Sequence, residues 1–321
     1  MKREFDILVI GELNVDLILN GLPSLPEEGK EIIANQMTLT LGSSSAIFAS
    51  NASTLGNKVA FLGKTGTDMF GDLVFKSLEE KKVDTRFIIR SSIDKTGATI
   101  VLNFDEDRAM VTYPGAMETL KPEDINENWL SKAGHMHLSS VFLQPALKKE
   151  IVSIFKMAKE LGLTTSLDVQ WDPAEKWDLN MKELLPLVDV FLPNETELRA
   201  LTGEQDMDKA IESVKPLINT MAIKMGNKGS RGVTKETDIT IKPFLNKKVV
   251  DAIGAGDSFN AGFITGFLAG KPLPGCLEYG NLTGAVSTTA AGGTGAFDSL
   301  EGFRQKAGKE FGFKENFNNL F

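Results

Sequence analysis

The sequence is poor in cysteine and histidine. Its 321 residues include one cysteine and two histidines. A single cysteine excludes an internal disulfide and an all-cysteine metal site, and the absence of a His-Glu-x-x-His motif argues against a zinc enzyme. No apolar run is long enough to cross a membrane, and the first residues show no signal-peptide pattern. We therefore expect a protein of the reducing cytoplasm.

Positive charge is also in deficit. The chain has 35 lysines and arginines against 43 aspartates and glutamates, a net charge of −8. Such a balance argues against a general surface for nucleic acid or for an anionic membrane, so neither partner is expected. It leaves room for a local basic pocket that holds a nucleotide.

Familiar nucleotide-binding and hydrolase motifs are missing. No Gly-x-Gly-x-x-Gly follows the first apolar run, and no Gly-x-Ser-x-Gly elbow occurs. Gly63, Lys64 and Thr65 resemble the end of a P-loop, but the upstream position that requires glycine holds Lys58. Dinucleotide enzymes, P-loop enzymes and serine hydrolases are therefore disfavoured.

Short continuous apolar runs alternate with segments of helical periodicity. Such runs are typical of buried parallel strands, and the helical period is clearest over residues 146–161, which Gly162 ends. The alternation predicts an α/β fold with a mostly parallel sheet and ligands at the carboxyl ends of its strands. The predicted strands are residues 6–11, 59–63, 136–138, 164–168, 188–192 and 221–225.

Two segments break this alternation. Residues 14–40 and 95–113 contain stretches of period two, such as Thr-Ile-Val-Leu-Asn-Phe, with no helix between them. This pattern predicts a small accessory β-sheet. The length fits one domain over residues 1–321 with that sheet as an appendage. The polar tail 309–321 suggests no role.

The glycine-rich stretch at residues 251–262 is the most informative motif. Gly254, Ala255 and Gly256 stand directly before Asp257, and a helical pattern of small and apolar residues follows. Small side chains let backbone N–H groups gather at a helix N-terminus, where they suit a phosphate under transfer. A carboxylate there makes chemical sense as a base that takes the proton of an attacking hydroxyl. The alternative is a glycine turn with Asp257 as the N-cap.

Polar side chains follow the first predicted strand. Asn14 and Asp16 are two residues apart, so an extended segment points both the same way. An amide and a carboxylate together can read the hydroxyls of a polyol. The alternative is a turn with an N-capping aspartate.

Two more segments follow later strands. Asn194 and Glu197 are three apart and share a helix face, where they could hold the water shell of Mg²⁺; a structural capping box is the alternative. Lys224 ends another strand, and Gly226 and Gly229 permit close approach to a nucleotide or simply make a turn.

Taken in order, these motifs resemble the ribokinase-like, phosphofructokinase B-type carbohydrate kinases over nearly the whole chain. The resemblance implies a three-layer sandwich with a mostly parallel central sheet and a small β-sheet lid built from about 14–40 and 95–113. It also implies transfer of the γ-phosphate of ATP, with Mg²⁺ and in many members K⁺, to a hydroxyl of a small-molecule substrate. A homodimer through the lid is a further expectation.

The resemblance also assigns roles to residues. Asp257 corresponds to the catalytic base, and the backbone of Gly254, Ala255 and Gly256 to the anion hole. The corresponding nucleotide positions are Asn194, Lys224, Gly226, Gly229, Gly293 and Gly295. The corresponding metal positions are Asn194 and Glu197 for Mg²⁺, and Asp251 and Ile253 for a monovalent cation. The corresponding substrate positions are Asn14, Asp16, Gly42, Ser43 and Ile47.

This chain departs from the family pattern on the substrate side. Members usually carry Gly-Gly-x-x-x-Asn where it has Gly42, Ser43 and Ile47. We expect Asn51, one helical turn further on, or the hydroxyls of residues 43–45 to replace the missing contact. Relatives that act on keto-acid sugars often carry an arginine where this chain has Asp172, which favours a neutral substrate.

The expected function is an ATP-dependent kinase of a neutral sugar or polyol. A nucleoside or sugar-phosphate kinase on the same fold is one alternative. A non-catalytic sugar-binding or regulatory relative is another, against which the intact Asp257 and its glycine-rich nest argue.

Overall fold

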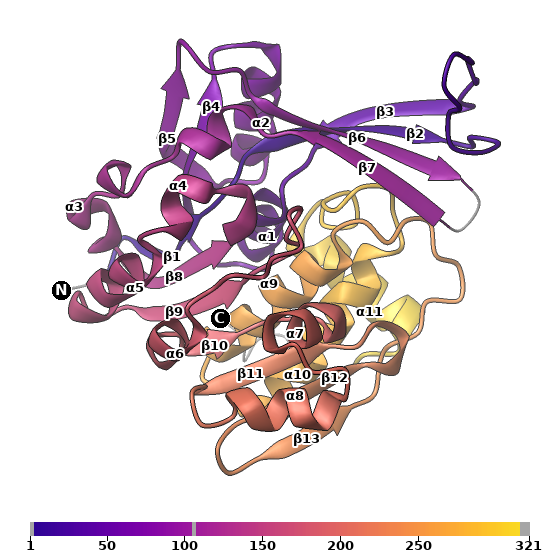
Figure 1. Cartoon of the computed structure of the whole chain (residues 1–321). Coiled ribbons are helices and arrows are strands. Elements are labelled where there is room, and N and C mark those ends of the chain that lie inside the picture. The colour runs from indigo at the N-terminus through magenta and orange to yellow at the C-terminus, as the bar shows by residue number, and fades with distance from the viewer. Residues whose placement is uncertain (1–2, 105–106, 315–321) are drawn as a thin grey trace.

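A nine-stranded sheet forms the centre of the computed structural model, which describes residues 3–104 and 107–314 (Figure 1). The strand order is β13-β12-β11-β10-β9-β8-β1-β4-β5. The pairs β11–β12 and β12–β13 are antiparallel, and the other pairs of this sheet are parallel. The strands are β1 (Phe5–Ile10), β4 (Val59–Gly66), β5 (Asp84–Ser91), β8 (Ala133–Ser139), β9 (Thr164–Asp168), β10 (Val190–Phe191), β11 (Thr220–Lys224), β12 (Ser230–Val233) and β13 (Asp238–Ile241).

Helices cover both faces of this sheet. Strand β1 shows why, because Leu8 and Ile10 face one hydrophobic core while Ile7 and Val9 face the other. The first core is covered by α3 (Glu127–Leu130), α4 (Pro145–Lys148), α5 (Ile151–Glu160), α6 (Met181–Leu184), α7 (Glu195–Thr202) and α8 (Met207–Val214). The second is covered by α1 (Ser44–Thr54), α2 (Met69–Glu80), α9 (Ala255–Leu268), α10 (Leu273–Ser287) and α11 (Leu300–Phe311).

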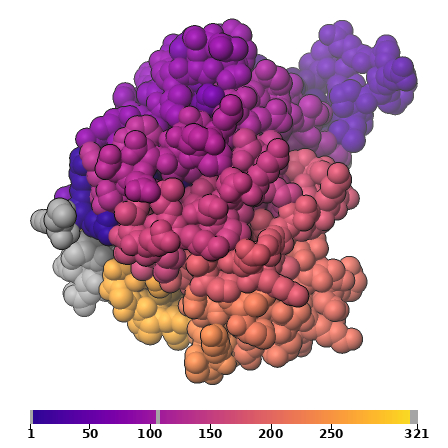
Figure 2. Space-filling model, turned by 60° about the vertical axis from the view of Figure 1, so that its left-hand side comes forward, coloured from indigo at the N-terminus to yellow at the C-terminus, as the bar shows by residue number. Residues whose placement is uncertain are grey.

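A second, four-stranded sheet projects from one side of this body and overhangs the C-terminal half (Figures 1 and 2). Its order is β3-β2-β6-β7, from β2 (Asn14–Asn20), β3 (Gln36–Leu41), β6 (Gly97–Phe104) and β7 (Asp107–Tyr113). We call it the small sheet. Both segments predicted for it are present, apart from residues 105–106, which lie outside the described residues.

The predicted strands are confirmed, and the predicted helix over residues 146–161 is wrong in one respect. It is divided into α4 and α5, with Lys149 and Glu150 between them. No apolar side chain between Leu147 and Ile151 anchors this turn to the core, since Lys149 and Glu150 are exposed. Gly162 follows α5 with φ +74°, as a helix-ending glycine does. Part of the 309–321 tail, residues 315–321, lies outside the described residues.

No helix in the described part of the chain has both the length and the apolar character needed to span a bilayer.

Candidate active site

A cleft of about 1320 Å³ opens where the parallel strands end. Its floor is formed by the segments that follow β1, β8, β9, β10 and β11 and by the start of α9, and the inner face of the small sheet forms one wall. The carboxyl edge of a parallel sheet is where α/β proteins bind ligands. Most of the residues singled out in the sequence meet here.

The start of α9 forms the centre of the cleft. Gly254 is the N-cap, with φ +73° and no side-chain cap, and Asp257 is the third residue of the first turn. A β-carbon on Gly254 would lie 2.5 Å from the Cα of Gly293, so both conformation and space require glycine there. The first N–H groups of a helix have no acceptor within the helix. The alternative of Asp257 as the N-cap is wrong, and the first turn of α9 is open to an anion.

Asp257 is nearly enclosed, with 7% of its surface exposed. Burial, and next the negative charge of Asp168, raise its pKa to about 7, while Lys224 acts in the opposite direction. Its Oδ1 accepts a hydrogen bond from Nε2 of Gln170 at 3.0 Å. A carboxyl group with such a pKa can exchange a proton near neutral pH.

Asp168 lies beneath the cleft, in contact with the lining residues Lys224 and Gln170, and was not among the site residues predicted from the sequence. This fully buried carboxylate ends β9, and its Oδ2 accepts hydrogen bonds from Lys224 Nζ at 2.7 Å, from Gln170 Nε2 at 2.9 Å and from Asn260 Nδ2. Burial alone would lower the pKa of Lys224, but the charges of Asp168 and Glu197 hold it above its usual value. The available signal was the place of Asp168 at the carboxyl end of the predicted strand 164–168.

The start of α7 reaches the same cleft. The side-chain oxygen of Asn194 accepts the N–H of Glu197, and the Glu197 carboxylate accepts both the Asn194 N–H and, at 2.7 Å, its Nδ2. The capping box proposed as the alternative is therefore present. Both residues also line the cleft, and burial followed by the charge of Asp168 raises the pKa of Glu197.

Asn14 and Asp16 lie side by side on the inner face of β2, as the period of two predicts. Asn14 Nδ2 donates to Asp16 Oδ1 and to Thr99 Oγ1, both at 3.0 Å. Burial raises the pKa of Asp16 to about 6, against the effect of the Asn14 hydrogen bond. A β-carbon on Gly42 would lie 2.3 Å from Asp16 Oδ1, so this glycine lets the two side chains sit against the backbone.

The start of α1 carries the residues that depart from the family pattern. Ser43 is the N-cap at φ +69°, where its hydroxyl donates to the Glu12 carbonyl and accepts the Ala46 N–H. Ile47 lines the cleft and packs on Gly293. Asn51 does not line it: it is fully buried and its Nδ2 donates to Ser258 Oγ and the Gly293 carbonyl. This geometry does not support Asn51 as a substrate contact.

Of the two glycine pairs predicted to bind the nucleotide, one lines the cleft and the other does not. Gly226 and Gly229 both have positive φ, flank a short 3₁₀ turn and line the cleft. Gly293 and Gly295 lie behind the start of α9 instead and are not among the residues that line the cleft. A further, largely apolar part of the cleft wall, which begins beside Gly229, was not predicted from the sequence. Its residues are Pro243, Phe244, Leu245, Asn246, Val249, Asn281, Gly284, Ala285 and Thr288.

Asp251 joins two loops beside the cleft. Its Oδ1 accepts the N–H of Ile253 and its Oδ2 accepts the N–H of Gly292, each at 2.9 Å. The carboxylate therefore ties the segment before α9 to the loop behind it.

An open helix start beside buried carboxylates, at the edge of a parallel sheet, can bind a phosphate group and hold a base next to it. Comparison with known proteins gives the family: residues 4–299 match the pfkB family carbohydrate kinase. The chain belongs to this family and is a sugar or nucleoside kinase in the broad sense.

Individual relatives agree with this assignment. A protein of Archaeoglobus fulgidus named as an uncharacterized sugar kinase is 32% identical over 238 residues, which are 73% of this chain and 92% of the relative. The deoxyribokinase of Salmonella typhi is 28% identical and covers 94% of this chain and 98% of its own. The ribokinase structure of Thermotoga maritima has a TM-score of 0.81 at 26% identity, over 94% and 98% of the two chains. An adenosine kinase structure of Sinorhizobium meliloti, at 23% identity and TM-score 0.83, covers 94% and 99% and shares the fold.

Proposed function

We propose that this protein transfers the γ-phosphate of ATP to a hydroxyl group of a neutral sugar or polyol. The observation that carries the proposal is the junction of three features in one cleft. They are the open first turn of α9, the buried carboxyl group of Asp257 and the polar pair of Asn14 and Asp16.

Asp257 is the proposed general base. Its pKa of about 7 makes its carboxylate a stronger base than an ordinary aspartate. The hydrogen bond from Gln170 fixes Oδ1 and leaves the other oxygen to accept the proton of the acceptor hydroxyl. Gln170 is itself tied to Asp168, so the base is oriented by groups on β9.

Residues 254–257 supply the proposed anion hole. Their N–H groups are presented at a helix N-terminus, where the helix dipole favours the charge that develops on a phosphoryl group. Space is available, since a β-carbon on Gly256 would meet only the Lys224 side chain, at 3.8 Å. Lys224 thus lies close to the hole and can balance phosphate charge while Asp168 holds it in place.

The cleft fits Mg²⁺ as a companion of the nucleotide. In the described part of the chain no group of three or more acidic, histidine or cysteine side chains could hold a metal ion alone. Asn194 and Glu197 would therefore hold the ion through water, which matches the preference of Mg²⁺ for several water ligands. When bound, the ion would neutralise phosphate charge. The loop with Gly226 and Gly229 and the apolar wall beside it would hold the nucleoside part of ATP.

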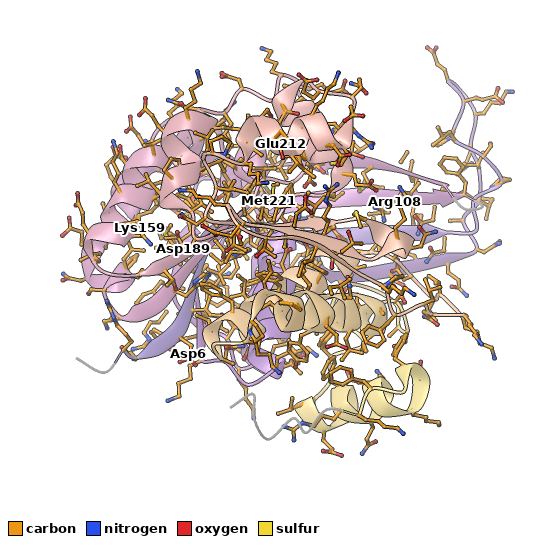
Figure 3. All side chains as sticks on the ribbon, turned by 90° about the horizontal axis from the view of Figure 1, so that it is seen from below. Asp6, Arg108, Lys159, Asp189, Glu212 and Met221 are labelled. Carbon is orange, nitrogen blue, oxygen red and sulfur yellow. The ribbon has the colours of Figure 1, made fainter. Side chains whose placement is uncertain are left out.

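The charges around Asn14 and Asp16 support a neutral acceptor. Two cationic side chains line the cleft among the described residues, Lys224 and Arg108. Lys224 is paired with Asp168. Arg108 stands on β7 four residues from Thr112, the residue level with Thr99. Four residues of strand span ~14 Å at 3.4 Å per residue, so the backbone of Arg108 lies far along the small sheet from Thr112. Figure 3 labels Arg108 on this sheet.

One observation favours a second candidate, a nucleoside acceptor. Beyond the polar pair the cleft is lined by apolar side chains that include Val101 and Phe142, and by Met110 and Trp171, which are 59% and 50% exposed. Large exposed apolar side chains inside a cleft suit a flat, apolar part of a ligand. A nucleoside presents both a sugar and such a part.

The small sheet serves as a lid and as a dimer surface in this proposal. Its inner face carries Asn14 and Asp16, so closure would exclude water from the reacting groups. Its outer face is apolar and exposed, which suits a second copy of this chain. The exposed residues of the outer face are Met37, Leu39, Ile100, Val111 and Tyr113.

A turnover screen tests the proposal. Purified protein with Mg²⁺-ATP is offered pentoses, hexoses, inositols, sugar acids, sugar phosphates and nucleosides, and acceptor-dependent ADP release is measured. We expect the largest kcat/KM with a neutral sugar or polyol. A preference for nucleosides supports the second candidate, and absence of turnover despite measurable sugar binding supports a non-catalytic protein. Repeating the screen in KCl and in choline chloride tests the cation site at Asp251 and Ile253.

A further inference from the structure

Glu12 is a buried carboxyl group that the mechanism above does not use. It follows β1, lines the cleft and is only 2% exposed. Burying a carboxyl group costs free energy unless hydrogen bonds compensate for it. The contacts of Glu12 therefore indicate what it does.

These contacts hold the beginning of α1. Glu12 Oε1 accepts the N–H of Ser45 at 3.3 Å, and Oε2 accepts the Ser45 hydroxyl. The Glu12 carbonyl accepts the hydroxyl of Ser43 at 2.6 Å. Ser45 Oγ also lies 2.6 Å from Ser139 Oγ, at the end of β8. A β-carbon on Gly11 would lie 1.8 Å from Ser45 Oγ, so the sequence leaves room for this contact.

Helix α1 in turn contacts the start of α9. Asn51 Nδ2 donates to Ser258 Oγ at 2.9 Å, one residue after Asp257. Ile47 lies below the start of α9, with Cγ2 3.1 Å from where a β-carbon on Gly254 would stand. A shift of α1 would therefore move the proposed base and the proposed anion hole together.

We propose that Glu12 is a positioning residue: its carboxylate clamps the first turn of α1 to the ends of β1 and β8 and thereby aligns Asp257 with the phosphate-binding turn. The inference rests on the proposed function. Glu12 acts through Ser45 and helix α1 rather than by contact with the acceptor or the phosphate.

The charge of Glu12 provides a readout that packing alone would not move. Asp16 on β2 and Asp257 on α9 are the described ionisable groups that interact with it, while α1 and β8 present serine hydroxyls. Burial raises the pKa of Glu12 itself, and in its ionised form Glu12 raises the pKa of both aspartates. Removing that charge should lower the pKa of Asp257.

Two variants separate the clamp from the charge. Glu12→Asp keeps the charge but is one methylene too short to reach Ser45, whereas Glu12→Gln keeps the length and removes the charge. Asp6→Asn is the matched control, because Asp6 is an exposed carboxylate at the other end of β1, far from the small sheet in Figure 3. The acceptor found in the screen is used for all four proteins.

For Glu12→Asp we expect a loss in kcat of about tenfold or more, as for a misplaced catalytic group. The KM for ATP should stay within about twofold and the acid limb of the pH–rate profile should stay in place. For Glu12→Gln the acid limb should move to lower pH, since a like charge has been removed. Asp6→Asn should match the wild type in both. Wild-type kcat in Glu12→Asp, or an unmoved limb in Glu12→Gln, overturns the proposal.

A second measurement needs no acceptor. The free energy of unfolding against pH is recorded for the wild type, Asp257→Asn, Glu12→Gln and the double variant. The difference between proteins with and without Asp257 gives the pH window that Asp257 contributes, once with Glu12 and once with Gln at position 12. We expect this window to shift to lower pH when Glu12 is Gln. If the wild type has no turnover, the proposed function fails while this shift still tests the link between Glu12 and Asp257. An unchanged window contradicts that link.

Discussion

Two helices begin at the cleft with a carboxylate at the same position and use it differently. In α7 the N-cap is Asn194, and Glu197, three residues on, folds back to close the first turn. In α9 the N-cap is Gly254, which has no side chain, and Asp257, also three residues on, accepts a hydrogen bond from Gln170 on another strand. The cap residue decides the outcome. A polar cap engages the carboxylate in local structure, whereas a glycine cap leaves both the carboxylate and the N–H groups to a ligand.

Asp257→Asn should give the largest effect in this comparison. The amide keeps the shape of the side chain but cannot accept a proton, so we expect kcat to fall by at least ~10²-fold. Glu197→Gln, the matched change at the start of α7, should cost clearly less in kcat because its carboxylate does not act on the acceptor. The measurement is kcat for both variants at saturating ATP and acceptor. A near-normal kcat in Asp257→Asn would remove the base assignment.

Gly256→Val tests the open first turn of α9. The surroundings tolerate a β-carbon, since the nearest atom would be Lys224 Cδ at 3.8 Å, so the protein should fold. The branched side chain would occupy the space where a phosphate approaches the N–H groups. Losing one such donor typically lowers the rate by about 10²–10³-fold. Gly256→Ala is the control and should lose less. Normal turnover in a folded Gly256→Val protein would mean that phosphate does not bind there.

Ionised Asp257 should lower the free energy of unfolding of the protein. Its pKa is raised from 3.8 to about 7 in the folded protein. The stabilisation of its protonated form is complete below pH ~4 and is lost as the pH rises to about 7. Asp257→Asn removes this loss. We therefore expect the difference in free energy of unfolding, variant minus wild type, to increase between pH 4 and 8. The gain should be up to about 4 kcal/mol, at 1.36 kcal/mol per pKa unit. Urea titrations at several pH values measure it, and a constant difference contradicts the assignment.

Much of this arrangement could be predicted from the sequence, because it depends on local patterns. Continuous apolar runs located the strands of the central sheet, and glycines before Asp257 located the open helix start. The period of two placed Asn14 beside Asp16.

The remainder depends on contacts between distant segments, which no local pattern encodes. Asp168 meets Lys224 and Asn260 only because β9, β11 and α9 converge in the folded chain. From its position on α1, Asn51 could face either the cleft or α9. It faces α9, because its side chain hydrogen-bonds to Ser258, 207 residues away. The break after α4 likewise depends on which side chains the core receives.

Ile47→Asn tests the substrate side of the cleft. Ile47 places an apolar side chain near the start of α9, where typical relatives present an amide. A buried polar group without a partner costs roughly 1–3 kcal/mol. We therefore expect kcat/KM for the native acceptor to fall by about ten- to a hundredfold, and the ranking of the sugar panel to move toward the sugars of typical relatives. The ranking should not change if Ile47 only supports Gly254 and Gly293 from behind. Ile47→Val is the control for packing.

Asn194→Ala should give the smallest effect and separates the two uses of the α7 start. Removing this N-cap should cost about 1 kcal/mol of unfolding free energy. Asn194→Ser should recover most of that stability, because serine caps helices nearly as well as asparagine. Neither variant keeps the amide Nδ2 that donates to Glu197. If Asn194 and Glu197 together hold the water shell of Mg²⁺, both variants should therefore need more Mg²⁺ for half-maximal turnover, whatever their stability. If Asn194→Ser has wild-type stability and a wild-type Mg²⁺ requirement, the start of α7 is a structural cap alone, and the contrast with α9 becomes complete.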